Sequence, residues 1–424
     1  MNTNRRRFIA GAAAFAGFPT IIPASALGRD GTVAPSKRIT LGGIGLGPRG
    51  REVLKPFLDQ ADAHFVAICD VQKERAEIIR RIVNRQYNNE DCQVHRRMEE
   101  LLERKDIDAV IIATGDRWHA LASVRAAKAG KDIYCEKPCA MSIAETREID
   151  EAVTQAKRVF QAGTQRRNVN NFRFAAELAR AGKLGAIRTV HAGSIRPGLG
   201  SPPLPGQPLP DPEELDWDRW LGPAPALAYH PDYCRGRWRN HDELCSGYRV
   251  LEWGAHTIDL CQWAAGMDAT SPVEFEPEGD TIRARYANGI QLVIREAGFK
   301  NEGKWLGFGT CPVRFEGEDG WVEAGDSGKV QTNREDNYGQ QVPEVMFGTN
   351  PAHHVREFLD CVKSRAATAC NSGIMRRTHV TGHAAAIAWR LGRKLTFDPA
   401  TERFVGDDEA NALCKRARRE AYQA

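Results

Sequence analysis

The sequence predicts an α/β protein in which a doubly wound parallel sheet is followed by an α+β domain with a mostly antiparallel, open-faced sheet. A glycine-rich turn between an apolar strand and a helix, at residues 45–50, is the first observation behind this prediction. The second is a regular alternation of short strands and helices up to about residue 161, and the third is a change to longer strands from about residue 162. We therefore expect a leader over 1–28, a first domain over 37–161 and a second over 162–424.

Length and composition exclude several classes of protein. The chain has 424 residues, of which 42% are hydrophobic and 27% charged, which is ordinary for a soluble globular protein. A formal net charge of +4 with interspersed charges gives no electrostatic signature for nucleic acid or anionic lipid, so we expect neither as a partner and no membrane association. The eleven cysteines show no zinc-ligand spacing, and we expect no metal site.

The first residues have the pattern of an export signal. Arg5-Arg6-Arg7-Phe8-Ile9 is followed by an apolar run to about residue 18 and by the small residues Ala24-Ser25-Ala26. A basic segment, a short apolar segment and an A-x-A site are together typical of a secretory signal, and the run is too short to span a bilayer. The Arg-Arg-x-Phe-Ile core resembles a twin-arginine signal, the route for proteins that fold before export. We therefore expect a periplasmic protein.

The glycine-rich turn has the context of a dinucleotide-binding site. Gly45-Leu46-Gly47-Pro48-Arg49-Gly50 follows an apolar strand at 38–44 and precedes a helix, and a second strand at 64–69 ends at Asp70. In a G-x-G-x-x-G turn the first glycine allows the tight bend, the second admits the pyrophosphate, and the third lets the helix pack on the strand. An acid after the next strand accepts hydrogen bonds from the adenosine ribose and repels a 2′-phosphate. These features predict a Rossmann domain that binds NAD in preference to NADP.

Each later element of the first domain is predicted by its own pattern. Residues 107–113 form a continuous apolar run, as expected for a parallel strand covered on both faces, and residues 131–135 form a further strand. Thr114 and Glu136 follow these strands, and ligands of open α/β sheets bind at such carboxyl ends. The intervening patterns predict helices over 73–85, 98–102 and 120–129.

The second domain is predicted from strands of a different kind. Some of its apolar segments alternate, which favours an antiparallel sheet with one packed face. These segments are 187–195, 281–286, 290–294, 312–315 and 321–324. Between residues 196 and 212, seven prolines predict an extended surface segment, which we interpret as a crossover loop or, alternatively, as a lid or a dimer arm.

Several strings in the two domains carry a family resemblance. Glu136-Lys137-Pro138 follows a strand downstream of the nucleotide fingerprint, and Glu252-Trp253-Gly254-Ala255-His256 lies in the second domain. Further strings occupy residues 114–119 (TGDRWH), 163–167 (GTQRR), 217–223 (WDRWLGP), 358–364 and 391–395. In this order they resemble the glucose-fructose oxidoreductase, inositol dehydrogenase and MocA family (Gfo/Idh/MocA), in its exported twin-arginine branch. The resemblance runs from about residue 38 to residue 420.

The resemblance implies an oxidoreductase that uses a nicotinamide cofactor and acts on a secondary hydroxyl or keto group of a sugar, polyol or glycoside. Oxidation of a hydroxyl needs a base within hydrogen-bonding reach and a cation beside the developing alkoxide. His256 suits the base because an unperturbed imidazole titrates near neutrality, and the resemblance assigns Lys137 to the cation or relay role. Glu252 lies four residues before His256, so on a helix its carboxylate would reach the imidazole and orient it.

Other residues complete the expected site. We expect the cofactor to contact the glycine-rich turn (Gly45, Gly47, Pro48, Arg49 and Gly50) together with Asp70, Thr114, Gly115, Trp118, His119, Glu136, Lys137 and Gln165. For the substrate we expect contacts from Arg166, Arg167, Trp238 and Tyr248. Two positions depart from the family pattern: Glu252 replaces an aspartate, and Gly115 replaces a proline that would stiffen the loop beside the nicotinamide.

The sequence leaves the net reaction open. The periplasm offers no ready supply of free NAD, so we expect a tightly bound cofactor that is recycled within each catalytic cycle. Such a cofactor suits a glycosidase that oxidises its substrate transiently and then reduces it again. It also suits a sugar–sugar oxidoreductase that couples two substrates in ping-pong fashion. A third reading is a sensor that binds NAD without catalysis. The family commonly uses its open sheet face in assembly, which implies a homo-oligomer, either a dimer or a tetramer.

Overall fold

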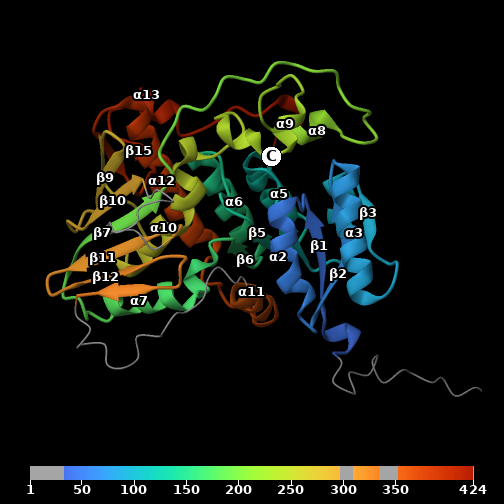
Figure 1. Cartoon of the computed structure of the whole chain (residues 1–424), viewed down its shortest axis with the longest axis horizontal. Coiled ribbons are helices and arrows are strands. Elements are labelled where there is room, and N and C mark those ends of the chain that lie inside the picture. The colour runs from blue at the N-terminus through green and yellow to red at the C-terminus, as the bar shows by residue number, and fades with distance from the viewer. Residues whose placement is uncertain (1–32, 297–308, 334–351, 424) are drawn as a thin grey trace, which may run out of the picture.

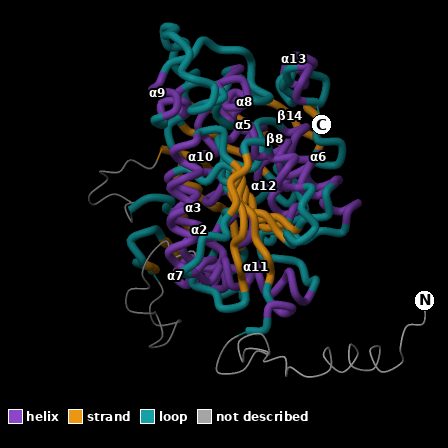
Figure 2. The backbone as a smooth tube through the Cα atoms, turned by 90° about the vertical axis from the view of Figure 1, so that its right-hand side faces the viewer, coloured by secondary structure: helices purple, strands orange, loops and turns teal. Residues whose placement is uncertain are grey.

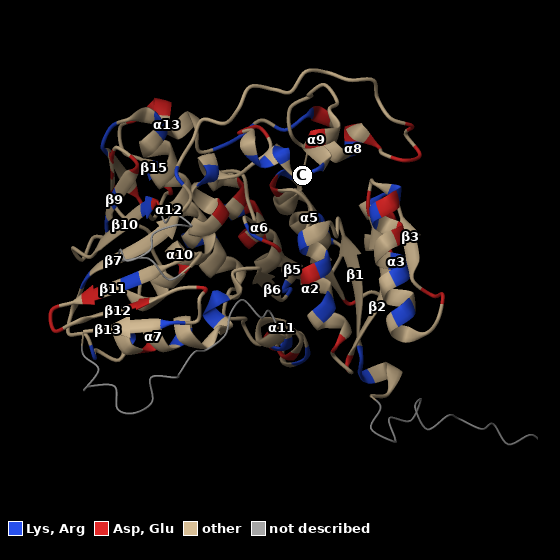
Figure 3. Cartoon of the chain, in the orientation of Figure 1, with Lys and Arg blue, Asp and Glu red and all other residues tan. Residues whose placement is uncertain are grey.

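A computed structural model describes residues 33–296, 309–333 and 352–423 of the chain. The leader predicted over 1–28 lies outside these residues. Figure 1 shows two bodies side by side, each built around a β-sheet: the first is coloured blue to teal, and the second contains the green, orange and red strands. Lys and Arg are interspersed with Asp and Glu over the elements of both bodies (Figure 3).

The first domain contains a six-stranded parallel sheet within the described residues. Its strands are, in spatial order, β3 (Gln93–His95), β2 (Ala63–Cys69), β1 (Ile39–Ile44), β4 (Ala109–Ile112), β5 (Asp132–Cys135) and β6 (Phe160–Ala162). The strand order reverses between β1 and β4, and the carboxyl ends of such strands border a ligand crevice. The predicted Rossmann sheet is confirmed. β6 ends just before the string at 163–167, which resembles a strand end of the family, while β3 has no counterpart in the sequence prediction.

Helices cover both faces of this sheet (Figure 2). They are α2 (Pro48–Leu58), α3 (Lys73–Tyr87), α4 (Met98–Leu102), α5 (Asp116–Lys128), α6 (Ile143–Ala156) and, from the far end of the chain, α11 (Ala352–Ser364). On one face Phe57 of α2 packs edge-on against Tyr134 of β5 and Phe358 of α11, with ring centroids 5.4 and 6.0 Å apart. All residues of β4 are buried, which explains the continuous apolar run there.

The second domain contains a nine-stranded sheet within the described residues. Its strands are, in spatial order, β13 (Val330–Thr332), β12 (Trp321–Ala324), β11 (Val313–Gly317), β7 (Ile187–Ser194), β10 (Gln291–Glu296), β9 (Thr281–Arg285), β8 (Glu274–Glu278), β14 (Leu395–Asp398) and β15 (Arg403–Phe404). Of the pairs formed by these strands, β7 with β10 is parallel and the others are antiparallel. The predicted, mostly antiparallel sheet is thereby confirmed.

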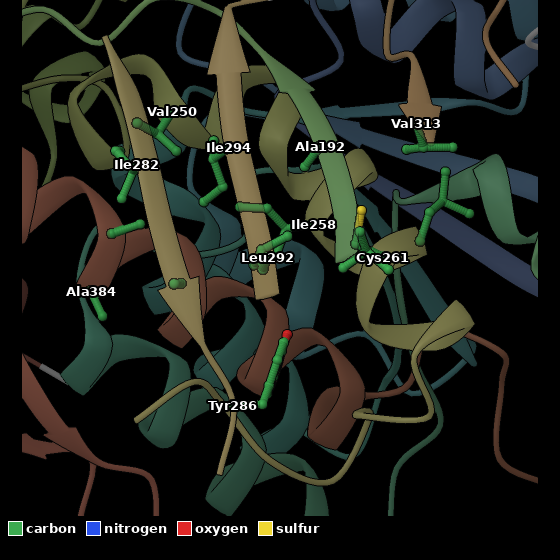
Figure 4. Packing of buried hydrophobic residues seen from close by; sticks show 14 of the residues in the cluster. Ala192, Val250, Ile258, Cys261, Ile282, Tyr286, Leu292, Ile294, Val313 and Ala384 are labelled. Carbon is green, nitrogen blue, oxygen red and sulfur yellow. The ribbon is translucent and has the colours of Figure 1, made fainter. Parts of the chain in front are cut away.

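One face of the second sheet packs on α7 (Asn170–Arg180), α10 (Val250–Ala264) and α12 (Ser372–Leu391). Figure 4 shows Ile258 of α10 beside Leu292 of β10 in this core, with Ile282 of β9 and Ala384 of α12 nearby. Helix α10 is buried along most of its length, so its position is fixed by packing on both sides. This matters for the site, because α10 carries Glu252 and His256.

The proline-rich segment 196–212 forms neither helix nor strand, as predicted, and crosses the end of both domains at the top of Figure 1. It leads to α8 (Trp217–Leu221) and α9 (Pro231–Cys234). Just before α8, the carbonyl of Glu213 accepts a hydrogen bond from Arg96 at 3.0 Å, and that of Glu214 accepts one from the Lys73 amide at 3.1 Å. The segment therefore returns the chain from the second domain to the first.

The remaining short elements are α13 (Asp408–Ala412) and the 3₁₀ helices η2 (Pro35–Lys37), η3 (Gln165–Asn168), η4 (Arg237–Asn240), η5 (Gly247–Arg249) and η8 (Glu420–Tyr422). Among them η3 follows β6 and packs against α7, α10 and α11, so it lies where the first domain meets the second. The helix η5 leads into α10 and packs against α10 and α12.

Candidate active site

The glycine-rich turn between β1 and α2 has the shape of a phosphate-binding loop. Gly45 has φ +67°, and a Cβ added there would lie 2.3 Å from the side chain of Thr114. A Cβ on Gly47 would meet only the guanidinium of Arg75, at 3.2 Å, so this backbone faces the open groove. Gly50 is buried where α2 packs on the sheet. Each glycine thus meets the requirement of its position in a dinucleotide turn.

Asp70 directly follows β2 and lines the same groove. Its carboxylate accepts a hydrogen bond from the backbone N–H of Gln72 at 2.9 Å. Burial raises the pKa of this carboxyl to about 6, although hydrogen bonds from the backbone and the charge of Arg75 oppose the shift. Arg75 also donates to the carbonyl of Cys234 at 2.5 Å, which joins the first domain to the outer wall of the groove.

Arg117 is a buried cation in that wall which the sequence analysis does not single out. Its Nε and Nη2 donate to the carbonyl of Trp220 at 2.8 and 2.6 Å, and the guanidinium lies 3.7 Å from the centre of the Trp220 ring. A Cβ on Gly115 would lie 2.2 Å from Nη1 of Arg117. Since Gly115 has φ −77°, which proline also adopts, the glycine reflects the space that Arg117 occupies and not a looser backbone.

The residues of this groove fit a dinucleotide. The cavity has a volume of about 250 Å³ and lies at the N-terminus of α2, where Pro48 is the first helical residue. Nη1 of Arg117, which lines the groove, is buried and has no hydrogen-bond partner among the described residues, and the same holds for Oε2 of Glu136 and Nε2 of His119 beside the adjoining cavity. Buried polar atoms are normally satisfied, so a polar ligand is the natural partner for them.

A second cavity, of about 290 Å³, adjoins the groove. Thr114 and Trp238 line both cavities, and the second one extends to α10. Lys137, which follows β5, lines it and donates from Nζ to the main-chain carbonyl of Glu252 at 2.6 Å. Burial lowers the pKa of Lys137, although the nearby carboxylate of Glu136 opposes the shift.

His256 of α10 lines the second cavity in contact with an arginine. Its Nε2 lies 2.5 Å from Nη1 of Arg166. Nε and Nη2 of Arg166 in turn donate to the two carboxylate oxygens of Asp326, at 3.1 and 2.7 Å. Burial holds the pKa of His256 well below its usual value, and the positive charges of Arg166 and Lys137 lower it further. The imidazole is therefore neutral at neutral pH.

Glu252 does not make the contact that its spacing suggests. The structure gives no hydrogen bond between Glu252 and His256, although both side chains line the second cavity from the same helix. The Glu252 carboxylate instead lies 3.8 Å from Nε of Arg249. The group that contacts the imidazole is Arg166.

The structure brings most of the predicted residues to these two cavities. The groove is lined by Gly45, Gly47, Pro48, Arg49, Asp70, Thr114, Gly115, Trp118 and Trp238. The second cavity is lined by His119, Glu136, Lys137, Gln165, Arg166, Glu252 and His256, and again by Arg49, Thr114 and Trp238. Arg49 links the two groups, because it donates to Glu136 at 3.2 Å.

Two predicted substrate residues lie elsewhere. Arg167 is buried behind the site, where it pairs with Asp259 at 2.7 Å and with Asp268 at 2.7 Å. Tyr248 lines a separate cavity and lies near Arg390, whose guanidinium is 5.0 Å from the centre of the Tyr248 ring. Neither side chain lines the groove or the second cavity.

Several lining residues lie after the proline-rich segment 196–212. Cys234, Arg235 and Arg239 line the groove, and Arg239 also lines the second cavity. The sequence offers no motif for them, since their role depends on how this segment returns to the first domain. Trp220, another lining residue, belongs to the string at 217–223, so the family resemblance could have predicted its role.

Two family models match the chain. The model described as oxidoreductase family, NAD-binding Rossmann fold, matches residues 39–164. The model of that family's C-terminal alpha/beta domain matches residues 200–424, which is more than half of the chain. The chain belongs to the Gfo/Idh/MocA oxidoreductase family. The predicted family is confirmed, whereas the exported branch stays a prediction.

Named relatives of this Gfo/Idh/MocA protein act on different compounds. Inositol 2-dehydrogenase of Agrobacterium fabrum is 27% identical over 210 residues, which is 49% of this chain and 61% of the relative. A 2,7-anhydro-N-acetylneuraminate hydratase of Mediterraneibacter gnavus is 28% identical over 149 residues, 35% of this chain and 37% of the relative. These alignments span less than two thirds of each relative's length.

The fold also matches solved structures. An aldose-aldose oxidoreductase from Caulobacter crescentus aligns with a TM-score of 0.59 at 17% identity, covering 85% of this chain and 100% of that one. In the part of the Gfo/Idh/MocA chain that the structure describes, no helix has the length and apolarity needed to cross a membrane. The same residues contain no group of three or more His, Cys, Asp or Glu arranged to hold a metal ion.

Proposed function

We propose that the protein is a NAD-dependent oxidoreductase that exchanges a hydride between its bound cofactor and a secondary hydroxyl or keto group of a sugar, polyol or glycoside. The observation that carries this proposal is the junction of the two cavities at Thr114 and Trp238. A substrate in the cavity of Lys137 and His256 would lie against a dinucleotide in the groove. A polyol dehydrogenase and an aldose-aldose oxidoreductase among the relatives support the substrate class.

Each part of the site has a chemical role under this proposal. When bound, NAD⁺ would supply the acceptor for the hydride that the substrate carbon loses. Asp70 favours NAD over NADP, because its carboxylate would repel a 2′-phosphate. Lys137 lines the second cavity and can take the hydroxyl proton, and its ammonium form can stabilise a developing alkoxide. His256 lines the same cavity in contact with Arg166.

The test begins with the protein as purified, without added nucleotide. Any bound nucleotide is released and identified by chromatography, and a tightly held NAD(H) is expected. The protein is then mixed with myo-inositol, D-glucose and methyl glucosides, and reduction of the cofactor is followed by its absorbance. Lys137→Met is expected to lower the rate by roughly 10²- to 10⁴-fold. The matched control is Arg173→Gln, at an exposed ion pair with Glu177 remote from both cavities. An absence of nucleotide, or an unchanged rate in Lys137→Met, would refute the proposal.

A second candidate function has one observation in its favour. The Mediterraneibacter relative is named a hydratase, so a protein similar to this chain has a net reaction that is not a redox reaction. The corresponding activity here is that of a NAD-dependent glycosidase, which oxidises its substrate transiently and reduces it again. Hydrolysis of a methyl glucoside with no accumulation of NADH would favour this candidate over the dehydrogenase. A sensor predicts nucleotide binding but no reaction with any probe.

We also propose that the protein is exported to the periplasm and assembles as a homo-oligomer. The Arg5-Arg6-Arg7-Phe8-Ile9 pattern supports export. The single-layered second sheet, with helices on one face, supports assembly through the other face. Light scattering of the purified protein tests the second proposal, and a monomer would contradict it.

A further inference from the structure

The contact between Arg166 and His256 fixes which ring nitrogen carries the proton. A guanidinium has only N–H donors, so at 2.5 Å the Nε2 atom of His256 must be the acceptor. A neutral imidazole with an unprotonated Nε2 carries its proton on Nδ1. Nδ1 is buried and has no hydrogen-bond partner among the described residues. Neither ring nitrogen therefore offers a free lone pair to a substrate in the second cavity.

Arg166 is held rigidly in this contact from its other side. The side chains of Arg166 and Asp326 are 9% and 8% exposed, so their two-point ion pair is shielded from water. The hydroxyl of Thr310 also donates to the Asp326 carboxylate. A paired, buried guanidinium keeps its orientation better than a single-point contact would. Asp326 thus acts through Arg166 on the imidazole.

Besides burial, four groups on neighbouring elements disfavour a charged imidazole at His256: Arg166 of η3, Lys137 after β5, Arg49 of α2 and His354 of α11. The carboxylate of Glu136 lines the same cavity, where it accepts a hydrogen bond from Arg49. On α10 itself, the carboxylate of Glu252 lies near Arg249, and that of Asp259 is paired with Arg167. Neither carboxylate of α10 is therefore placed to orient the imidazole of His256.

From this geometry we propose that Arg166 is a positioning residue that occupies the Nε2 lone pair of His256, so that Lys137 and not His256 receives the substrate proton. This inference rests on the proposed oxidation of a hydroxyl. In the proton step the substrate O–H bond breaks, the proton passes to the lone pair of neutral Nζ, and the lysine becomes an ammonium. Nζ is suited to this step because Lys137 lines the second cavity, where burial lowers its pKa and so favours the neutral amine. His256 then serves to fix the position of Arg166 beside the substrate.

The protonation of His256 can be measured without any substrate. The full-length protein, with its bound nucleotide, is labelled with ¹⁵N-histidine, and the imidazole signals are recorded by NMR from about pH 5 to about pH 8, a range that covers ordinary histidine titration. His256→Gln identifies the signals of His256 by their loss. In the wild type we expect a neutral ring that is protonated on Nδ1 at every pH. In Arg166→Met we expect a ring that takes up a second proton as the pH falls, with its midpoint moved upward toward the ordinary value.

Further variants keep the test decisive. If Arg166→Met fails to fold, Asp326→Asn loosens the same contact, and it should shift the His256 titration in the same direction. Arg166→Lys retains a single donor and should restore part of the wild-type behaviour. Arg173→Gln is the matched control, because Arg173 forms an exposed ion pair with Glu177 and lines neither cavity, and its spectrum should equal that of the wild type. A wild-type His256 that is protonated on Nε2, or that titrates normally, would overturn the inference.

The last part of the test measures the rate of cofactor reduction by whichever probe reacts. Lys137→Met should lower the rate of reduction at least tenfold more than His256→Gln does, whereas equal losses would return His256 to the role of base. The NMR result does not depend on turnover. If none of the probes reduces the cofactor but the His256 ring is protonated on Nδ1, the proposed function is contradicted while the positioning role of Arg166 stands.

Discussion

Replacing Arg167 should lower the stability of the protein, because the structure places this arginine in buried ion pairs. The sequence predicts instead that Arg167 contacts the substrate. Arg167 donates to Asp259 at 2.7 and 2.9 Å and to Asp268 at 3.0 and 2.7 Å. The side chains of Arg167 and Asp259 are 4% and 2% exposed. Replacing Arg167 by Gln would leave the buried carboxylate of Asp259 without its cation. Breaking a buried pair in this way costs about 3–5 kcal/mol of unfolding free energy.

An exposed arginine in the same domain provides the comparison. Arg173 pairs with Glu177 one turn away on α7, with side chains 61% and 55% exposed, and such pairs contribute about 0–1 kcal/mol. Both variants are unfolded in urea and followed by tryptophan fluorescence and circular dichroism. With two domains the transition need not be two-state, so the two midpoints are compared for each probe. We expect a large downward shift for Arg167→Gln and almost none for Arg173→Gln.

The pH dependence of this difference has a defined sign. Burial already raises the pKa of Asp259, although Arg167 opposes the shift. Without Arg167 the folded-state pKa rises further above the unfolded value, so the folded variant binds more protons than the unfolded chain. The loss of stability is then greatest at neutral pH and decreases as the pH falls through the raised pKa. Equal midpoints for the two variants, or an Arg167→Gln protein of normal stability with weakened substrate binding, would refute this reasoning.

Three further predictions concern the cofactor and export. Gly115→Pro should displace Arg117 and weaken NAD binding roughly 10- to 100-fold, which corresponds to the loss of one hydrogen bond to a charged group. Arg117→Met should weaken NAD binding by the same factor. The double variant should bind NAD no more weakly than either single variant, as measured by calorimetric titration. Since the pKa of Asp70 is about 6, its carboxylate loses its charge below that pH and NAD affinity should fall there, whereas Asp70→Asn should bind weakly at every pH. Replacing both Arg5 and Arg6 by Lys should retain the protein in the cytoplasm, as measured by fractionation and immunoblotting, and unchanged export would exclude the twin-arginine route.

The elements of the first sheet could be predicted because each is defined by its own residues. A parallel strand covered on both faces is a continuous apolar run, so β1, β2, β4 and β5 were visible without their neighbours. The second sheet was harder to predict in full. β14 pairs with β8 across more than one hundred residues of chain, and β14 has only Leu395 and Phe397 facing the core. So short an alternation is indistinguishable from a loop until its partner strand is known.

Some residues of the candidate site could be predicted from the chain next to them, whereas others depend on contacts with distant residues. The glycine-rich turn, Asp70 and Lys137 were recognisable because their roles depend on the strand that precedes each of them. The spacing of Glu252 and His256 correctly predicts a shared helix, but it does not determine the partner of the imidazole. That partner is Arg166, 90 residues earlier in the chain. The glycine at 115 likewise has its explanation in a side chain, Arg117, whose position follows from packing against Trp220.

The outer wall of the dinucleotide groove has a consequence for the order in which the molecule matures. Trp220, Cys234 and Arg239 are contributed after the chain has already entered the second domain. A truncated polypeptide ending near residue 161 would carry the complete fingerprint but would lack this outer wall, and it should retain nucleotide poorly. Loading must then wait until synthesis has passed residue 239, and the nucleotide comes from whichever compartment the polypeptide folds in.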